Sequence, residues 1–158
     1  MNPFEQALDI ATRMREALQT ELAAARDQRV LVRKLDVQGL FERARRRGEF
    51  NIKLAQMQGA LGEALAAVAA ALGTAKVTLE VLRASETTSA EALAEGLSEL
   101  RASAQALQEI DNFNQGLGKR ALACVRGYLS ALSPRADAYD RFGGIRGDNV
   151  ATFVRQVA

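Results

Sequence analysis

The sequence predicts an all-α protein, an elongated bundle of three long antiparallel helices with one short connecting helix. Three observations carry this prediction. Apolar residues recur at intervals of three and four over long stretches, which is the spacing of one helix face. The only two prolines among the 158 residues are Pro3 and Pro134, so no proline interrupts a helix between them. Valine and isoleucine are too sparse, and alternating apolar and polar runs too short, to support a sheet.

The first long helix is expected to begin near Pro3, a residue suited to the first turn of a helix. Its apolar face is interrupted at Arg29 and is predicted to contain Phe4, Leu8, Ala11, Met14, Leu18, Leu22, Ala25 and Val32. Charged residues such as Glu16, Glu21 and Arg26 are predicted to lie off this face, so one side of the helix is expected to face a core. Because aromatic residues are only 5% of the chain, that core is predicted to consist mainly of alanine and leucine.

A second long helix is predicted after Asp36, whose carboxylate can cap the first turn, and it is expected to end in a left-handed cap at Gly73. Its apolar face is predicted to contain Val37, Leu40, Ala44, Leu54, Leu61, Leu65, Val68 and Leu72. The same spacing places Arg47, Asn51 and Gln58 on this face. Since an unpaired buried polar group costs about 1–3 kcal/mol, the middle of this hairpin is predicted to be splayed, solvated or cross-bonded.

The apolar pattern of residues 76–84 predicts a two-turn helix. A strand is the alternative, because the run is too short to distinguish the two. The third long helix is predicted to run from Thr88 to Leu132, where Ser133-Pro134 stops it. Thr88 and Glu91 are interpreted as a capping box at its start. At 1.5 Å per residue this helix would be roughly 65 Å long, which is why the bundle is expected to be elongated.

Residues 1–132 are therefore predicted to form one helical bundle, and residues 133–158 an irregular C-terminal tail. Three glycines disfavour regular structure in that tail, at Gly143, Gly144 and Gly147. A final weak apolar pattern predicts one or two helical turns, with Val150, Phe153, Val154 and Val157.

The residue types present exclude several kinds of active site. There is no histidine, which removes histidine-based acid–base catalysis, catalytic triads and most transition-metal sites. Glu91, Glu95 and Glu99 form a row that could hold a hard cation, but a solvated helix face is the preferred interpretation because no opposing carboxylates are evident. No catalytic residue, metal site or cofactor is predicted, and the protein is interpreted as a non-enzyme.

The predicted location is the cytoplasm, without stable membrane insertion. The N-terminal residues lack the basic start and apolar run of a secretory signal. The longest apolar run, residues 64–72, is far shorter than the ~20 residues that span a bilayer. Cys124 is the only cysteine, so no internal disulfide can form, and its position on the apolar face predicts a buried thiol.

Two surfaces remain as candidates for binding. Arg43, Arg45, Arg46 and Arg47 form a basic cluster that could contact phosphates, but the net charge is only +2 and few aromatic residues are present to stack on bases. A charged helix surface is therefore the preferred interpretation, and no nucleic acid is expected as a partner. The long helix also has a second apolar stripe, which predicts a surface for a partner helix or for self-association: Phe113, Leu117, Leu122, Val125 and Leu129.

The C-terminal part of the long helix resembles the FlgN family of flagellar export chaperones. The segments that carry the resemblance are residues 110–117 (IDNFNQGL) and 121–129 (ALACVRGYL), followed by Tyr139-Asp140-Arg141-Phe142-Gly143 after a short linker. The order of two long helices, a short helix and a long terminal helix also agrees with that family. The chain departs from the family pattern at Asp140, where glycine is usual, and at Gly116 and Gly118, which replace longer side chains.

The resemblance implies a cytoplasmic chaperone of type III secretion that binds the helical C-terminal segments of hook–filament junction proteins and delivers them to the export gate. Together with the second stripe, it predicts a groove for the partner helix formed by Phe113, Asn114, Leu117, Leu122, Val125, Tyr128 and Leu129. Tyr139 matches the family's tyrosine that is expected to dock on the export gate; packing of its ring on the bundle is the other interpretation. A homodimer is left open. The alternative function is a coiled-coil interaction protein, or a nucleic-acid-associated protein that uses the arginine cluster.

Overall fold

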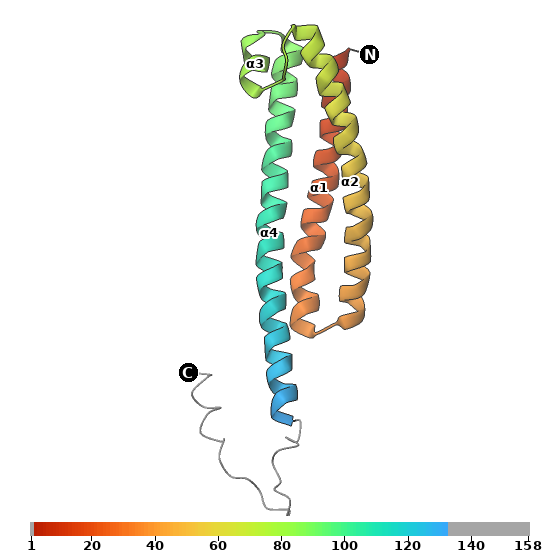
Figure 1. Cartoon of the computed structure of the whole chain (residues 1–158), viewed down its shortest axis with the longest axis vertical. Helices are drawn as coiled ribbons and strands as arrows, with labels where there is room; N and C mark the ends of the chain where they lie inside the picture. Colours follow the sequence, from red (N-terminus) through yellow and green to blue (C-terminus); the bar gives the residue numbers. More distant parts are fainter. Residues whose placement is uncertain (1, 133–158) are drawn as a thin grey trace, which may run out of the picture. The chain divides into compact units, whose positions relative to one another are not determined.

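The computed structural model describes residues 2–132, and every regular element among them is a helix (Figure 1). Helix α1 spans Pro3–Lys34, α2 spans Val37–Leu72, α3 spans Leu79–Ala84 and α4 spans Thr88–Leu132. Within residues 1–119, helices α1 and α2 form an antiparallel hairpin and α4 runs alongside it (Figure 1). The all-α prediction is confirmed, and residues 76–84 contain a short helix instead of a strand.

The chain divides into two units, residues 1–119 and residues 120–158. The first unit contains α1, α2, α3 and the larger part of α4. In the second unit the structure describes residues 120–132, which continue α4 without a break to Leu132. The predicted tail, with Tyr139, lies outside the described residues. No helix among residues 2–132 has an apolar stretch long enough to cross a membrane.

The ends of the α1–α2 hairpin are formed by local polar contacts. At the start of α1, the backbone N–H of Phe4 donates to Asn2 Oδ1 at 3.1 Å, and Glu5 accepts from the backbone N–H of Asn2, which makes a capping box. At the start of α2, Asp36 accepts a hydrogen bond of 2.9 Å from the backbone N–H of Gly39. Gly73 ends α2 with φ +66°, so both caps predicted for α2 are confirmed.

The cap of α4 differs by one residue from the prediction. The backbone N–H of Ala90 donates to Thr87 Oγ1 at 3.4 Å, and the N–H of Glu91 donates to the carbonyl of Thr87 at 3.0 Å. Thr87 is therefore the capping residue, and Glu91 lies one position too far along the helix to complete a capping box. The predicted capping box of Thr88 and Glu91 is wrong, although the helix does begin at Thr88.

The core of the bundle is built mainly from alanine and leucine, as predicted. Its buried members are Ala7, Ile10, Ala11, Met14, Leu18, Ala25, Leu61, Ala64, Val68, Leu82, Ala90, Leu93, Ala94, Leu100 and Leu107. Small side chains let the helices approach closely: a Cβ placed on Gly96 of α4 would lie only 2.7 Å from Leu8 Cδ1 of α1. The first half of α4 therefore packs on α1.

The core-facing side of α2 differs from the prediction in its N-terminal half. Val37 and Ala44 are exposed, and so are Asn51 and Gln58, which were predicted on the inner face. The residues that face the bundle in this half are Arg43, Arg47, Phe50, Leu54 and Met57. Counted back from Leu61, these residues follow one another at intervals of three or four positions, so they lie on the same side of α2 as Leu61. The prediction that Arg47 lies on the inner face is confirmed. The middle of the hairpin was predicted to be splayed, solvated or cross-bonded, and it is cross-bonded through Arg47.

Candidate partner-binding surface

The C-terminal part of α4 carries large apolar side chains that remain exposed to solvent. In residues 120–132, Leu122, Tyr128, Leu129 and Leu132 are 50%, 67%, 60% and 79% exposed, and Val125 is partly buried. Isolated exposed apolar residues are ordinary, but several within about three turns of one helix form a continuous apolar surface. Of the second stripe, Leu122 and Leu129 are exposed here and Val125 is partly buried.

Phe113 and Leu117 belong to the first unit and differ in their surroundings. Phe113 is 55% exposed, and the guanidinium of Arg29 from α1 lies 4.3 Å from the centroid of its ring. A guanidinium at this distance from an aromatic face makes a cation–π interaction. Leu117 is partly buried. One face of Phe113 is thus occupied by Arg29, while more than half of the side chain remains open to a partner.

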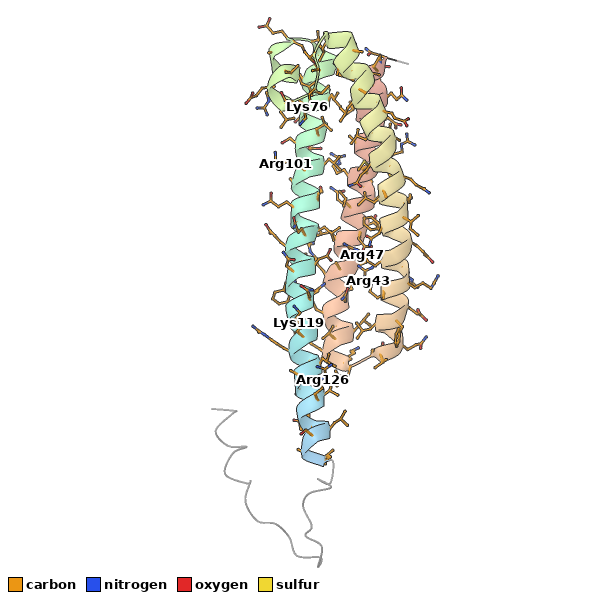
Figure 2. All side chains as sticks on the ribbon, in the orientation of Figure 1. Arg43, Arg47, Lys76, Arg101, Lys119 and Arg126 are labelled. Carbon is orange, nitrogen blue, oxygen red and sulfur yellow. The ribbon has the colours of Figure 1, made fainter. Side chains whose placement is uncertain are left out.

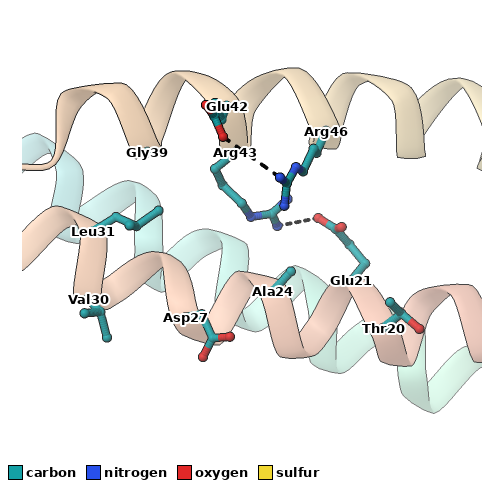
Figure 3. A pocket seen from close by; sticks show the side chains of 10 residues that line it. All are labelled: Thr20, Glu21, Ala24, Asp27, Val30, Leu31, Gly39, Glu42, Arg43 and Arg46. Atoms are coloured by element: carbon teal, nitrogen blue, oxygen red, sulfur yellow. Dashed lines mark hydrogen bonds and ion pairs between the residues drawn. The ribbon is translucent and has the colours of Figure 1, made fainter.

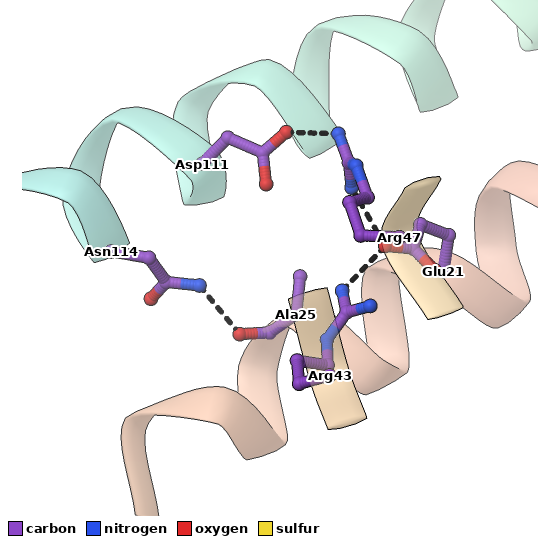
Figure 4. Close-up of polar contacts among 6 residues, drawn as sticks. All are labelled: Glu21, Ala25, Arg43, Arg47, Asp111 and Asn114. Atoms are coloured by element: carbon purple, nitrogen blue, oxygen red, sulfur yellow. Dashed lines mark hydrogen bonds and ion pairs between the residues drawn. The ribbon is translucent and has the colours of Figure 1, made fainter. Parts of the chain in front are cut away.

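Asn114 was predicted in the partner groove, but the structure places it inside the bundle. Its side chain is 5% exposed, and its Nδ2 donates a hydrogen bond of 2.7 Å to the backbone carbonyl of Ala25 in α1 (Figure 4). The amide is therefore used to hold α4 on α1. A hydrogen bond of this kind, from a buried amide to a main-chain carbonyl, stabilises the fold by about 1 kcal/mol.

Beside Asn114, four charged side chains from three helices form an ion-pair network (Figure 4). Glu21 of α1 accepts from Arg43 and from Arg47 of α2, the latter at 2.7 Å, and Arg47 also donates to Asp111 of α4. The side chains of Glu21 and Arg43 are only 9% and 10% exposed. Two carboxylates balance two guanidinium groups, so the network is neutral as a whole. It connects α1, α2 and α4 at one level of the bundle.

The other two arginines of the basic cluster are also paired with carboxylates. Arg45 donates to Glu49 at 2.6 Å, and Arg46 lies 3.9 Å from Glu42; all four side chains are more than half exposed. Figure 2 shows Arg43 and Arg47 together at the middle of the bundle, with Lys76 and Arg101 well away from them. The cluster is therefore a charged helix surface with two arginines turned inward. Nothing in this geometry favours the nucleic-acid alternative.

An open groove of about 690 Å³ lies between α1 and α2 near the turn that joins them (Figure 3). It is lined by Thr20, Glu21, Ala24, Asp27, Val30, Leu31, Gly39, Glu42, Arg43 and Arg46. The groove reaches the Arg43–Glu21 ion pair at its floor, so the side chains that would recognise a ligand there already bind each other. Sequence reasoning did not single out this groove, and all its lining residues belong to α1 and α2.

Three further predictions concern the acidic row of α4, the thiol of Cys124 and the ring of Tyr139. Among residues 2–132 no group of three possible ligand side chains is placed to hold a metal ion, and Glu99 of the predicted acidic row pairs with Arg15 instead. Cys124 is exposed, so the prediction of a buried thiol is wrong. Tyr139 lies outside the described residues.

The predicted position of Glu21 off the apolar face of α1 is wrong, because its side chain is buried, and sequence reasoning did not single out Asp111. For Glu21 a signal existed, because Glu21 follows Met14 and Leu18 and precedes Ala25 at steps of three and four, which places a carboxylate on the buried side of α1. A charge at such a position requires a partner from a facing helix. For Asp111 the sequence contains no comparable signal, because its pairing depends on where α4 lies against α2.

Comparison with known proteins adds one match. A family model described as FlgN protein matches residues 1–147 of the chain. No curated protein and no solved structure matches the chain. The matched range includes all four helices of the structure and extends beyond them to include Tyr139.

Proposed function

The chain belongs to the FlgN family of flagellar export chaperones, and we propose that it binds the helical C-terminal segments of hook–filament junction proteins. In this proposal the protein acts in the cytoplasm, without catalysis, and covers these segments until they reach the export gate. The observation that carries the proposal is the exposed apolar surface of α4 at Leu122, Tyr128, Leu129 and Leu132.

The physical basis is the burial of apolar surface between two helices. An amphipathic segment that is unfolded alone can fold as it lays its apolar side on α4. Ordering the segment offsets part of the free energy that burial contributes, so the complex is weaker than its contact area suggests. A moderate affinity suits a chaperone, because the segment has to be released for export.

We propose that the contact surface contains Leu122, Val125, Tyr128 and Leu129, which lie on one side of α4 within residues 120–132. Asn114 is not part of this surface, because its amide binds the carbonyl of Ala25. Gly116 and Gly118, which depart from the family pattern, do not interrupt α4, and nothing lies within 4 Å of a Cβ added at either position. The absence of side chains there leaves room for a partner close to the helix backbone.

Complex formation tests the proposal directly. The protein is mixed with peptides from the C-termini of hook–filament junction proteins and analysed by gel filtration and calorimetry. A complex with a dissociation constant in the micromolar range or below is expected, about −8 kcal/mol or stronger. A control peptide with serine at each apolar position of the segment should not bind. If no junction-protein segment binds at micromolar concentration, the proposal is wrong.

We further propose that Tyr139 contacts the export gate. This rests on the resemblance of residues 139–143 to the family element and on the family match, which extends through residue 147. Tyr139→Ala should leave segment binding unchanged and reduce secretion of the junction proteins in cells. Tyr128→Ala is the matched control, since loss of this exposed ring of α4 should weaken segment binding itself. If Tyr139→Ala weakens binding as Tyr128→Ala does, Tyr139 belongs to the segment groove.

A further inference from the structure

Helix α2 has an exposed side without charges, opposite the side that faces the core. From its N-terminus this side reads Val37, Phe41, Ala44, Gly48 and Ile52, each three or four residues after the last. All five are exposed, and the three large side chains are 62%, 70% and 65% exposed. A helix side that faces only solvent is normally polar and charged. This side is instead built as if it were covered.

The same side continues to the C-terminal end of α2 with small residues only. It reads Ala55, Gly59, Gly62, Ala66 and Ala70, again at steps of three and four and all exposed. We call the whole row, from Val37 to Ala70, the α2 outer face. Its large side chains lie in the N-terminal half and its smallest ones in the C-terminal half.

Among residues 2–132, no contact requires the glycines of the α2 outer face. Nothing lies within 4 Å of a Cβ added at Gly48, Gly59 or Gly62, so alanine would fit at each of them. Glycine in a helix interior is destabilising relative to alanine because it restricts the unfolded chain less. Glycines gathered on one exposed side instead allow the backbone of another helix to approach closely.

We propose that the α2 outer face packs against the same face of a second copy of this chain, with the two α2 helices antiparallel about a two-fold axis. The axis passes between residues 53 and 54. Val37 then lies opposite Ala70 of the second copy, and Phe41 lies opposite Ala66 of the second copy. Each large side chain of one half meets a small one of the other half, which is the self-complementarity that a two-fold interface requires.

The positions nearest the axis fit the same register. Ile52 lies opposite Ala55 of the second copy, and Gly48 lies opposite Gly59 of the second copy. Glycine therefore faces glycine, where the two backbones come closest, and the large Ile52 again faces an alanine. A partner unrelated to this chain would need no such agreement between the two halves of α2. The agreement selects a second copy as the occupant.

Charges beside the α2 outer face are also complementary in this register. Arg45 and Glu63 lie on the same flank of α2, and both are exposed. Among residues 2–132 Glu63 makes no ion pair, while Arg45 pairs only with Glu49 on its own helix. The two-fold axis brings Arg45 next to Glu63 of the second copy, and the same contact occurs twice. Such rim charges favour this register over others more than they add affinity.

The size of the contact predicts a weak dimer. The α2 outer face is about 50 Å long at 1.5 Å per residue, and a contact strip about 10 Å wide would bury roughly 1,000 Å² in total. This is at the lower limit for specific interfaces, so the dissociation constant is expected in the micromolar range. Sedimentation velocity from about 1 to about 500 μM should therefore show a concentration-dependent change from monomer to dimer.

Two neighbouring alanines provide a matched pair of variants. Ala66 lies on the α2 outer face and Ala67 about 100° around the helix from it, and both are exposed. Ala66→Glu places a charge opposite Phe41 of the second copy and should weaken the dimer by about tenfold or more, since each dimer buries two such charges. Ala67→Glu should change the dissociation constant less than about threefold. Circular dichroism should show that both variants remain helical.

The glycines give a test in which stability and association change in opposite directions. In the variant with Gly48→Ala and Gly59→Ala together, the monomer should melt at a higher temperature because alanine is the better helix former. The dimer should be weaker, because four added methyl groups separate the two backbones. If this face made no contact with a second copy, the melting temperature should rise while the association of the chains stayed unchanged.

Cross-linking tests the orientation. In a Cys124→Ser background, Phe41→Cys combined with Ala66→Cys should give a covalent dimer on oxidation. The two positions are roughly 37 Å apart within one helix, which is too far for a disulfide inside one chain. Phe41→Cys alone should not cross-link, because its counterpart lies at the other end of the partner helix.

Three results would overturn the proposal: a wild-type protein that stays monomeric to about 500 μM, equal association of the Ala66→Glu and Ala67→Glu variants, or cross-linking through Phe41→Cys alone. A monomer whose binding of junction-protein segments is lost in the Ala66→Glu variant would assign the face to the segment and also exclude the dimer. Because segment binding is measured separately, refutation of the dimer would not refute the proposed binding of segments to α4.

Discussion

Neutralising Glu21 is expected to destabilise the bundle more than the loss of any exposed charge. Glu21→Gln keeps the size of the side chain but removes the negative charge that faces Arg43 and Arg47. Breaking a buried ion pair by changing one partner typically costs 3–5 kcal/mol. Arg47 keeps Asp111 and is 27% exposed, so we expect the lower end of this range, about 3 kcal/mol. For a chain of this length that corresponds to a fall of about 6–12 °C in the melting temperature.

Urea denaturation followed by circular dichroism at 222 nm measures this loss. The control is Glu49→Gln, which removes the partner of Arg45 from an exposed pair and should cost less than about 0.5 kcal/mol. Adding Arg43→Met to Glu21→Gln should restore part of the stability, because the unpaired buried charge is then gone. A loss below about 1 kcal/mol for Glu21→Gln, or a loss equal to that of the control, would refute the argument that this network is a buried, paired cluster.

Three further outcomes are expected from single substitutions. Leu129→Ala should weaken segment binding about 5- to 30-fold, because Leu129 is 60% exposed and burial of this exposed part by a bound segment contributes about 1–2 kcal/mol. The neighbouring Ser130→Ala should not weaken binding, and equal effects of the two variants in calorimetry would exclude the proposed surface. Asn114→Ala should lower the free energy of unfolding by about 1 kcal/mol and leave segment affinity unchanged, and a larger effect on affinity would return Asn114 to the groove. Thr87→Ala should cost about 1 kcal/mol by loss of the α4 cap, whereas a greater loss for Thr88→Ala would show that the capping residue is assigned wrongly.

Helix boundaries and the apolar core were predictable because both depend on local sequence. Pro3, Asp36 and Gly73 act within one turn of their own position, so their effects follow from residue type alone. The apolar spacing of α1 likewise identifies most of its buried side, because that side is nearly continuous from Phe4 to Ala25. The cap of α4 was misplaced since Thr87 and Thr88 are chemically equivalent and only the geometry selects between them.

The polar part of the interface could not be predicted to the same extent. Between Ala44 and Leu54 the helix α2 has few large apolar residues, so its inner side was extrapolated and Asn51 was placed wrongly. Pairing of Arg47 with Asp111 requires that α4 lie at one particular height along α2, which no local pattern specifies.

These polar contacts also explain how a core of such small side chains can specify one arrangement. Sliding α4 along α1 by one helical turn would bring alanine and leucine onto alanine and leucine again, so apolar packing alone distinguishes the two registers poorly. The same slide would separate Arg47 from Asp111 and Asn114 from the carbonyl of Ala25. Unpaired groups at these partly or fully buried positions cost about 1–3 kcal/mol each, and more where a charge is involved. The energy gap between the correct register and its nearest competitor therefore comes mainly from a few polar side chains, while the apolar residues supply most of the stability that both registers share.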